Sequence, residues 1–157
     1  REAAEPHMAR GKTVRIDAPA GGRQPSILRQ PEIVHGLRNL IQNAVDFART
    51  GVTVELSWTD ALIEIRIEDD GAGFPPSVLS RIGDPFVQRR PWETGNNRPG
   101  YDGMGLGLFI AKTLLERTGA RLEFANGAGA IVIVSWNRDR IEAAPEGPLG
   151  HNRPLQI

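Results

Sequence analysis

The chain has 157 residues, a length that fits one domain with tails, because domains cluster around roughly 100–150 residues. Its 19 basic and 19 acidic side chains cancel, which argues against a nucleic-acid-binding module, whose surface is usually strongly basic. The sequence contains no cysteine, which excludes disulfides, cysteine–zinc sites and thiol catalysis, and no apolar run approaches the roughly 20 residues of a membrane-spanning helix.

The first third of the chain predicts a linker, two strands and a long helix. Residues 1–11 show no clear period and indicate a tether from an upstream part of a longer protein. Lys12–Asp17 alternates between apolar and polar residues, as a strand does, and Ser26–Arg29 would form a second, short strand. Pro31–Thr50 predicts a helix with proline at its first position and Gly51 as its left-handed cap. Its apolar face comprises Ile33, Leu37, Leu40, Ile41, Ala44, Phe47 and Ala48.

The middle of the chain predicts a hairpin, a short helix and a long loop. Val52–Trp58 and Leu62–Glu68 both alternate, and the three residues between them suit a tight connection. Pro75–Ile82 predicts a short helix that begins at two prolines. Residues 84–103 are polar and rich in Arg, Pro, Gly and Asn, and a loop of this length inside a compact domain is usually functional.

The last third predicts a second long helix and a second hairpin. Met104–Thr118 has helical apolar spacing and is followed by Gly119 as a cap. Arg121–Ala125 and Ala130–Trp136 form the hairpin, and residues 138–157 are expected to be a flexible tail. The order of elements predicts an α/β sandwich, a mixed and mostly antiparallel sheet with helices on one face.

A pair of asparagines marks the first long helix. Asn39 and Asn43 are four residues apart, so they lie on one face, with His35 and Asp46 on the same side. Taken alone, the pair is compatible with a solvated polar face. It is also compatible with a ligand wall, because an amide oxygen can complete the octahedron of a Mg²⁺ that phosphates already hold.

An acidic glycine turn follows the strand that ends near Glu68. In Asp69–Phe74, two glycines surround one small residue, which would let the backbone approach a flat ligand. A carboxylate at Asp69 could accept a hydrogen bond from an exocyclic amine such as that of adenine. In isolation the segment is equally compatible with a plain Asp-Gly turn.

A glycine-rich segment leads into the second long helix. Gly103–Leu108 would expose backbone N–H groups at a positive helix terminus, where phosphates bind. The alternative for this segment alone is a simple loop-to-helix transition. The three features occur in a fixed order, with the long polar loop before the last of them.

Four segments in this order resemble the motifs of the Bergerat-type ATPase superfamily, which includes gyrase, large heat-shock chaperones, MutL and histidine kinases. HGLRNLIQNAVDFA resembles its Asn box, DDGAGF its first glycine box, DPF its phenylalanine box and GMGLGLFIAKTLLERTG its second glycine box. The resemblance covers about Pro31 to Trp136. It implies the Bergerat ATP-binding fold for residues 12–137, with residues 1–11 as the linker from an upstream dimerisation domain.

The resemblance also implies a role for each matched residue. Asn43 would ligate Mg²⁺ and Asn39 would support the phosphates of ATP. Asp69 would accept the adenine amine, with Gly71 and Gly73 against the ring. The remaining residues expected at the nucleotide are Asp46, Phe86, Arg89, Arg98, Tyr101, Gly103, Gly105, Leu106, Gly107 and Leu108.

The residue four positions before the metal-binding asparagine separates branches of the superfamily. The hydrolases typically carry a glutamate base there, whereas this chain has Asn39, an amide that cannot accept a proton near neutral pH. This favours a sensor histidine kinase, in which the acceptor imidazole is already a nucleophile and catalysis is mostly positioning and charge neutralisation. A hydrolase of the same fold and a non-catalytic regulatory module remain the alternatives.

Within the histidine kinases, the phrases ILRQPEIVHGLRN, NAVDFA and IGDPF resemble the RegB/PrrB group of redox-responsive sensors. Two positions depart from common histidine kinase motifs: Asp46 stands where many members have a basic residue, and Gly83 where the phenylalanine box usually has Phe. The resemblance implies a histidine on a separate dimerisation domain as phosphate acceptor and a response regulator beyond it. It also implies a cytoplasmic domain of a protein anchored in the bacterial inner membrane.

Overall fold

The fold is a five-stranded sheet with two long helices packed against it. The computed structural model describes residues 3–4, 11–20, 24–80, 82 and 104–143. The strands are β1 (Thr13–Asp17), β2 (Gly51–Trp58), β3 (Leu62–Asp69), β4 (Arg121–Asn126) and β5 (Ala130–Asn137). The helices are α1 (Pro31–Phe47), α2 (Pro76–Leu79), α3 (Met104–Arg117) and α4 (Arg138–Ile141).

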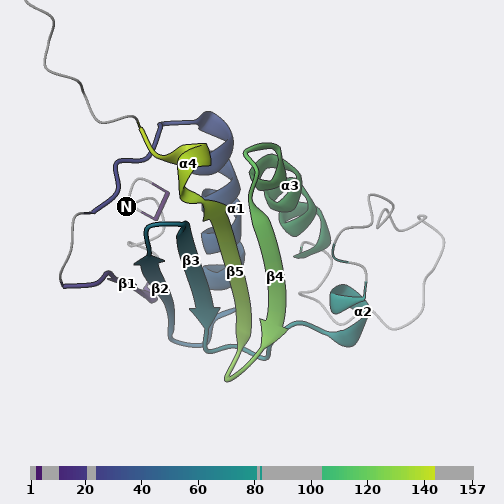
Figure 1. Ribbon diagram of the computed structural model, residues 1–157. Coiled ribbons are helices and arrows are strands. Elements are labelled where there is room, and N and C mark those ends of the chain that lie inside the picture. Colours follow the sequence, from purple (N-terminus) through teal and green to yellow (C-terminus); the bar gives the residue numbers. More distant parts are fainter. Residues whose placement is uncertain (1–2, 5–10, 21–23, 81, 83–103, 144–157) are drawn as a thin grey trace, which may run out of the picture.

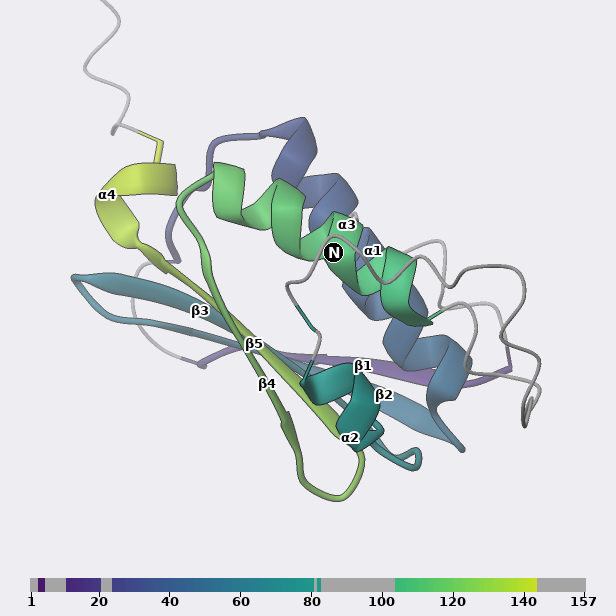
Figure 2. The ribbon, with the colours of Figure 1, turned by 90° about the vertical axis from the view of Figure 1, so that its right-hand side faces the viewer.

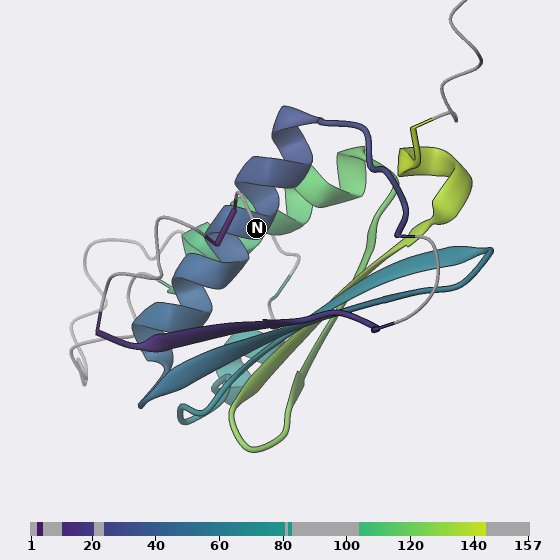
Figure 3. The same ribbon diagram turned by 90° about the vertical axis from the view of Figure 1, so that its left-hand side faces the viewer.

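The strand order is β1-β2-β3-β5-β4, as Figure 1 shows. β1 pairs with β2 in parallel, and the β2–β3, β3–β5 and β5–β4 pairs are antiparallel. Both α1 and α3 lie on one face of this sheet (Figures 2 and 3). The mixed, mostly antiparallel sheet with helices on one face is therefore confirmed.

The core lies between that face of the sheet and the two helices. Side chains alternate along β3, so Ile63, Ile65 and Ile67 point inward and are buried. α1 contributes its apolar face, as its helical spacing predicts. Near the start of α1, a β-carbon added at Gly36 would lie 2.5 Å from Leu115 Cγ, so α1 and α3 pack closely there. In the described part of the chain, no helix combines the length and apolar character needed to cross a membrane.

The first predicted helix and strands need corrections. α1 ends at Phe47, earlier than predicted, and Gly51 is the first residue of β2, not a helix cap. Ser26–Arg29 forms no full strand; only Ile27 pairs, in an isolated antiparallel bridge with Glu142. The cap at Gly119 is confirmed by its φ of +85°.

The C-terminal boundary also lies further along the chain than predicted. A flexible tail was expected from residue 138, but Arg138–Ile141 form α4 and Ile141 is fully buried. Arg138 holds this turn through two hydrogen bonds to the Glu142 carboxylate, of 2.6 and 2.8 Å. The reason is tertiary: residues 141–143 pair with the chain near Ile27, a contact that local sequence does not reveal. Residues 144–157 lie outside the described residues.

Candidate functional site

The asparagine pair lies on the flank of α1 that faces α3. Asn43 follows Gly36 by seven residues, about two helical turns, so both point to the same side, where Gly36 meets Leu115. Gly36 is near the start of α1 and Leu115 near the end of α3, so the two helices run antiparallel (Figure 2). Asn43, two turns after Gly36, therefore lies alongside the first half of α3. Asn39 and Asn43 are half-buried. Among the described residues, neither side-chain amide has a hydrogen-bond partner, so both are available to a ligand.

Two further polar residues of α1 are exposed. Asp46 accepts a 2.6 Å hydrogen bond from Gln42 Nε2, one helical turn earlier. Its charge repels phosphate, so Asp46 cannot replace the basic residue common at this position unless a cation lies between them. His35 is exposed as well.

Asp69 ends β3 and is the one charged side chain found buried among the described residues, with 4% of its surface exposed. Its Oδ1 accepts hydrogen bonds from the backbone N–H groups of Gly71, at 2.7 Å, and Ala130, at 3.2 Å. Burial raises the pKa of this carboxyl above its ordinary value, and the two backbone hydrogen bonds oppose the rise. Neither bond uses Oδ2, so the carboxylate is oriented by one oxygen and keeps the other as an acceptor.

The two glycines after Asp69 are required by contacts within the protein. A β-carbon at position 71 would lie 2.2 Å from the Phe47 carbonyl oxygen, at the end of α1. Gly73 has a φ of +78°, which side-chain-bearing residues rarely adopt. The first of these contacts brings the turn after β3 against the last turn of α1, four residues beyond Asn43. The turn after Asp69 and the helix that carries the Asn pair therefore meet at the end of α1.

The β4–β5 turn also contacts Asp69 and the turn that follows it, and the sequence interpretation missed these contacts. Asn126 Oδ1 accepts a 2.7 Å hydrogen bond from the Phe74 N–H, and Asn126 Nδ2 donates a 2.9 Å bond to the Phe74 carbonyl. A β-carbon at Gly129 would lie 2.2 Å from the Asp69 carbonyl oxygen. The sequence contains Asn-Gly-Ala-Gly between the two strands. This pattern predicts a turn, but it does not indicate which residues the turn contacts.

Asp70 is the second residue that the sequence interpretation left without a role. Its carboxylate accepts hydrogen bonds from the N–H groups of Arg49, at 2.7 Å, Thr50, at 3.0 Å, and Gly51, at 3.2 Å, and from the Thr50 hydroxyl. These donors hold its pKa well below the ordinary value. Asp69 and Asp70 therefore play different parts: Asp70 fixes the connection from α1 to β2, and Asp69 is buried against the start of β5.

Of the second glycine-box residues expected at the nucleotide, only some are exposed to solvent in the described part of the chain. Leu106 is 64% exposed, and a β-carbon at Gly107 would meet nothing within 4 Å. Leu108, expected at the nucleotide, is 1% exposed, so its side chain belongs to the core and only its backbone could reach a ligand. Gly105 lies in the first turn of α3, and Lys112 is paired with Glu116 at 2.7 Å. The predicted site residues that lie outside the described residues are Phe86, Arg89, Arg98, Tyr101 and Gly103.

The family model and the related sequences all indicate the same protein family. Residues 29–140 match the family model described as histidine kinase-, DNA gyrase B- and HSP90-like ATPase. The chain is 58% identical over 174 aligned residues to the sensor histidine kinase RegB of Cereibacter sphaeroides, covering 99% of the chain. It is 32% identical over 148 residues to the uncharacterized sensor-like histidine kinase R01002 of Rhizobium meliloti, covering 91% of the chain.

Two solved structures have the same fold. Full-length ShkA in complex with AMPPNP superposes with a TM-score of 0.67 at 26% identity, covering 92% of this chain and 29% of that one. The catalytic domain of histidine kinase ThkA superposes with a TM-score of 0.66 at 17% identity, covering 86% of each chain. The present chain spans 38% of the length of the RegB relative and 27% of the Rhizobium relative.

Proposed function

Because the chain belongs to the family of histidine kinase-, DNA gyrase B- and HSP90-like ATPases, we propose that it binds Mg²⁺-ATP and serves as the catalytic part of a sensor histidine kinase. In this proposal the γ-phosphoryl group passes to a histidine on a separate dimerisation domain. The observation that carries it is the contact between Gly71 and the Phe47 carbonyl oxygen. That close approach brings the turn after Asp69 against the end of α1, the helix that carries Asn43, and so supports a binding site shared by the two residues.

Asp69 is proposed to recognise the adenine. Its Oδ1 is held by two backbone N–H groups, so Oδ2 is the oxygen available to an exocyclic amine. Burial strengthens such a bond because it keeps competing water away. Gly71 and Gly73 keep the turn that orients Asp69, and the backbone beside them would lie against the adenine ring.

Asn43 is proposed to contribute one oxygen ligand to a magnesium ion. The donor fits, since Mg²⁺ prefers oxygen and is usually held by few protein groups together with the substrate phosphates. No group of three His, Cys, Asp or Glu side chains in the described ranges is arranged to hold a metal ion. The ATP phosphates and water would supply the rest of the coordination, and the ion would offset the negative charge of Asp46.

The start of α3 is proposed to bind the phosphates. Backbone N–H groups at a helix start are unpaired and carry a partial positive charge, which favours an anion there. The open space around Gly107 leaves the backbone of that turn accessible. The residues proposed for this part of the site are Asn39, Gly103, Gly105, Leu106, Gly107 and the Leu108 backbone, with Phe86, Arg89, Arg98 and Tyr101 from the segment before α3.

Transfer to histidine, and not to water, is supported by Asn39. A hydrolase needs a base to activate water, and the amide of Asn39 cannot take that proton. A neutral imidazole needs no such help: its nitrogen attacks the γ-phosphorus while the bond from phosphorus to the β,γ-bridging oxygen breaks and ADP leaves. The chain's own part is to bind ATP and to orient and neutralise its phosphates. The dimerisation domain, and a response regulator that receives the phosphoryl group from it, are the proposed partners.

The test is an incubation of the 157-residue chain with Mg²⁺ and γ-labelled ATP, with and without a separately purified dimerisation domain. We expect saturable binding, negligible phosphate release and no label on the chain. Adding the dimerisation domain should place an acid-labile label on that domain. Sustained multiple-turnover phosphate release from the chain alone would favour the hydrolase, and a complete lack of nucleotide binding would favour the non-catalytic module.

A further inference from the structure

The flank of α1 away from the asparagine pair carries an apolar groove. Residues two apart in a helix differ by about 200° around its axis, so Leu37 and Ile41 point away from Asn39 and Asn43. Leu37 and Ile41 face the sheet across a cavity of about 50 Å³. All of its lining side chains are apolar; they are Ala3, Ala4, Ile16, Leu37, Ile41, Val54, Leu56 and Ile65.

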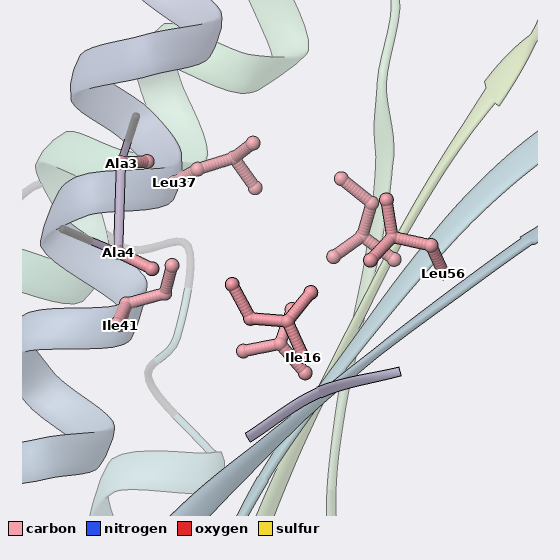
Figure 4. Close-up of a pocket in the computed structure, with 8 residues that line it drawn as sticks. Ala3, Ala4, Ile16, Leu37, Ile41 and Leu56 are labelled. Atoms are coloured by element: carbon pink, nitrogen blue, oxygen red, sulfur yellow. The ribbon is translucent and has the colours of Figure 1, made fainter. Parts of the chain in front are cut away.

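Ala3 and Ala4, described residues of the N-terminal segment (residues 1–12), form one wall of this groove. Ala3 is 8% exposed and Ala4 is 2% exposed, although neither belongs to a helix or strand. Figure 4 shows both residues beside α1, across the groove from Ile16 and Leu56. In Figure 3 the described part of this segment, drawn in purple beside the N label, lies in front of α1, and α3 lies behind that helix. An apolar residue suits this position because every side chain that lines the cavity is apolar.

Lys12, at the other end of the same segment, contacts the last turn of α1. Its Nζ donates hydrogen bonds to the backbone carbonyl oxygens of Val45, at 2.7 Å, Ala48, at 2.8 Å, and Asp46, at 3.3 Å. α1 has no basic residue in its own last turn, so Lys12 supplies the positive charge that a helix C-terminus favours. The described residues of this segment therefore lie against the middle of α1, through Ala3 and Ala4, and against its end, through Lys12.

We propose that the groove is the docking surface for the chain's own N-terminal segment, and that this docking sets the position of α1 and so the nucleotide affinity. On the far side of α1, Asn39 lies level with the groove contact at Leu37 and Ile41, and Asn43 lies between that contact and the Lys12 contact. A helix moves as a rigid unit, so a shift imposed through Ala4 or Lys12 displaces both amides relative to Asp69. Any part of a longer protein that precedes Ala3 would act on the site through this segment. The link to affinity rests on the proposed nucleotide role of α1; the docking does not.

The test compares Ala4→Asp with Ala18→Asp in the 157-residue chain. Ala18 is exposed just after β1, so this control introduces the same charge without entering the groove. We measure hydrogen exchange of the α1 amides without nucleotide, and the Kd for Mg²⁺-ATP by calorimetry. We expect Ala4→Asp to speed exchange in Ile33–Ile41 at least tenfold and to weaken ATP binding several-fold, with Ala18→Asp matching the wild type.

Two further variants keep the proposal open to refutation if Ala4→Asp does not fold. Lys12→Gln should speed exchange in Val45–Ala48 and weaken ATP binding, and Ala4→Val, which adds only apolar volume, should keep both wild-type values. Equal α1 exchange in Ala4→Asp and Ala18→Asp would overturn the docking. Faster exchange with an unchanged Kd would overturn the link to nucleotide affinity, whereas failure of the wild type to bind ATP would refute the proposed function itself. Protection of α1 that rises with protein concentration would assign the groove to a second copy of the chain.

Discussion

Replacing Asp69 by Asn separates the binding role of this residue from its role in the fold. The two side chains have nearly the same shape, so Asn Oδ1 can still accept the hydrogen bonds from the N–H groups of Gly71 and Ala130. The substitution alters only the other position of the side chain, where an NH₂ group replaces the free carboxylate oxygen Oδ2. An acceptor that faces the exocyclic amine of adenine is thereby replaced by a donor.

The expected loss of affinity follows from the strength of that one contact. A hydrogen bond to a charged group contributes about 1.5–3 kcal/mol. Since about 1.4 kcal/mol corresponds to a factor of ten in Kd, ATP should bind about 10- to 150-fold more weakly to Asp69→Asn. The folding stability should move the other way. Burial raises the pKa of Asp69, so its charged form opposes folding at neutral pH, and the uncharged Asn removes that cost.

The assay is isothermal calorimetry with Mg²⁺-ATP together with a thermal unfolding curve of the same protein at neutral pH. We expect a raised Kd together with an unchanged or higher melting temperature. Between pH 3.8 and the raised pKa of Asp69, the folded wild type binds more protons than the unfolded chain, so the contribution of Asp69 falls as pH rises. The stability advantage of Asp69→Asn should therefore grow with pH across that window. An unchanged Kd would show that Asp69 does not contact the adenine, and a large drop in melting temperature would show that its charge supports the fold.

Three other substitutions test the elements around this site. Asp70→Asn should lower the free energy of unfolding at neutral pH. Because the folded pKa of Asp70 lies below its ordinary 3.8, this loss of stability should shrink as the pH falls below 3.8. Urea unfolding curves at several pH values measure it, and a loss that does not depend on pH would contradict the role of the Asp70 charge. Asn126→Ala removes two hydrogen bonds to the Phe74 backbone and should lower the free energy of unfolding by about 1–3 kcal/mol. A value near zero in denaturant titrations would mean that water replaces both bonds. Gly36→Ala should lower the free energy of unfolding, although alanine has the better helix propensity. The added β-carbon would lie 2.5 Å from Leu115 Cγ, and overpacking of this kind typically costs about 1–3 kcal/mol. A raised melting temperature would show that α3 moves aside freely.

Much of the fold was readable from local pattern. The period-2 alternation of β3 and the helical apolar spacing of α1 are properties of neighbouring residues, and both elements form where those patterns lie. The incorrect predictions concern the residue at which α1 ends and the pairing of Ser26–Arg29. α1 stops at Phe47 because Asp70 and Lys12 fix the connection that follows it, and these partners are 19 or more residues away in sequence. The Ser26–Arg29 strand failed because its pairing partner is a single residue near α4.

By itself, the sequence determined the residue types available to the site, their order, and the amide at Asn39 that argues against hydrolysis. These are local properties, so motif spacing and residue chemistry were enough to predict them. Only the tertiary structure decided the surroundings of the two adjacent aspartates: Asp69 is buried against Ala130, 61 residues later, while Asp70 binds backbone N–H groups 19 to 21 residues earlier. Burial and pKa depend on neighbours in space, and a side chain's neighbours are set by how the strands and helices pack, which no local pattern encodes.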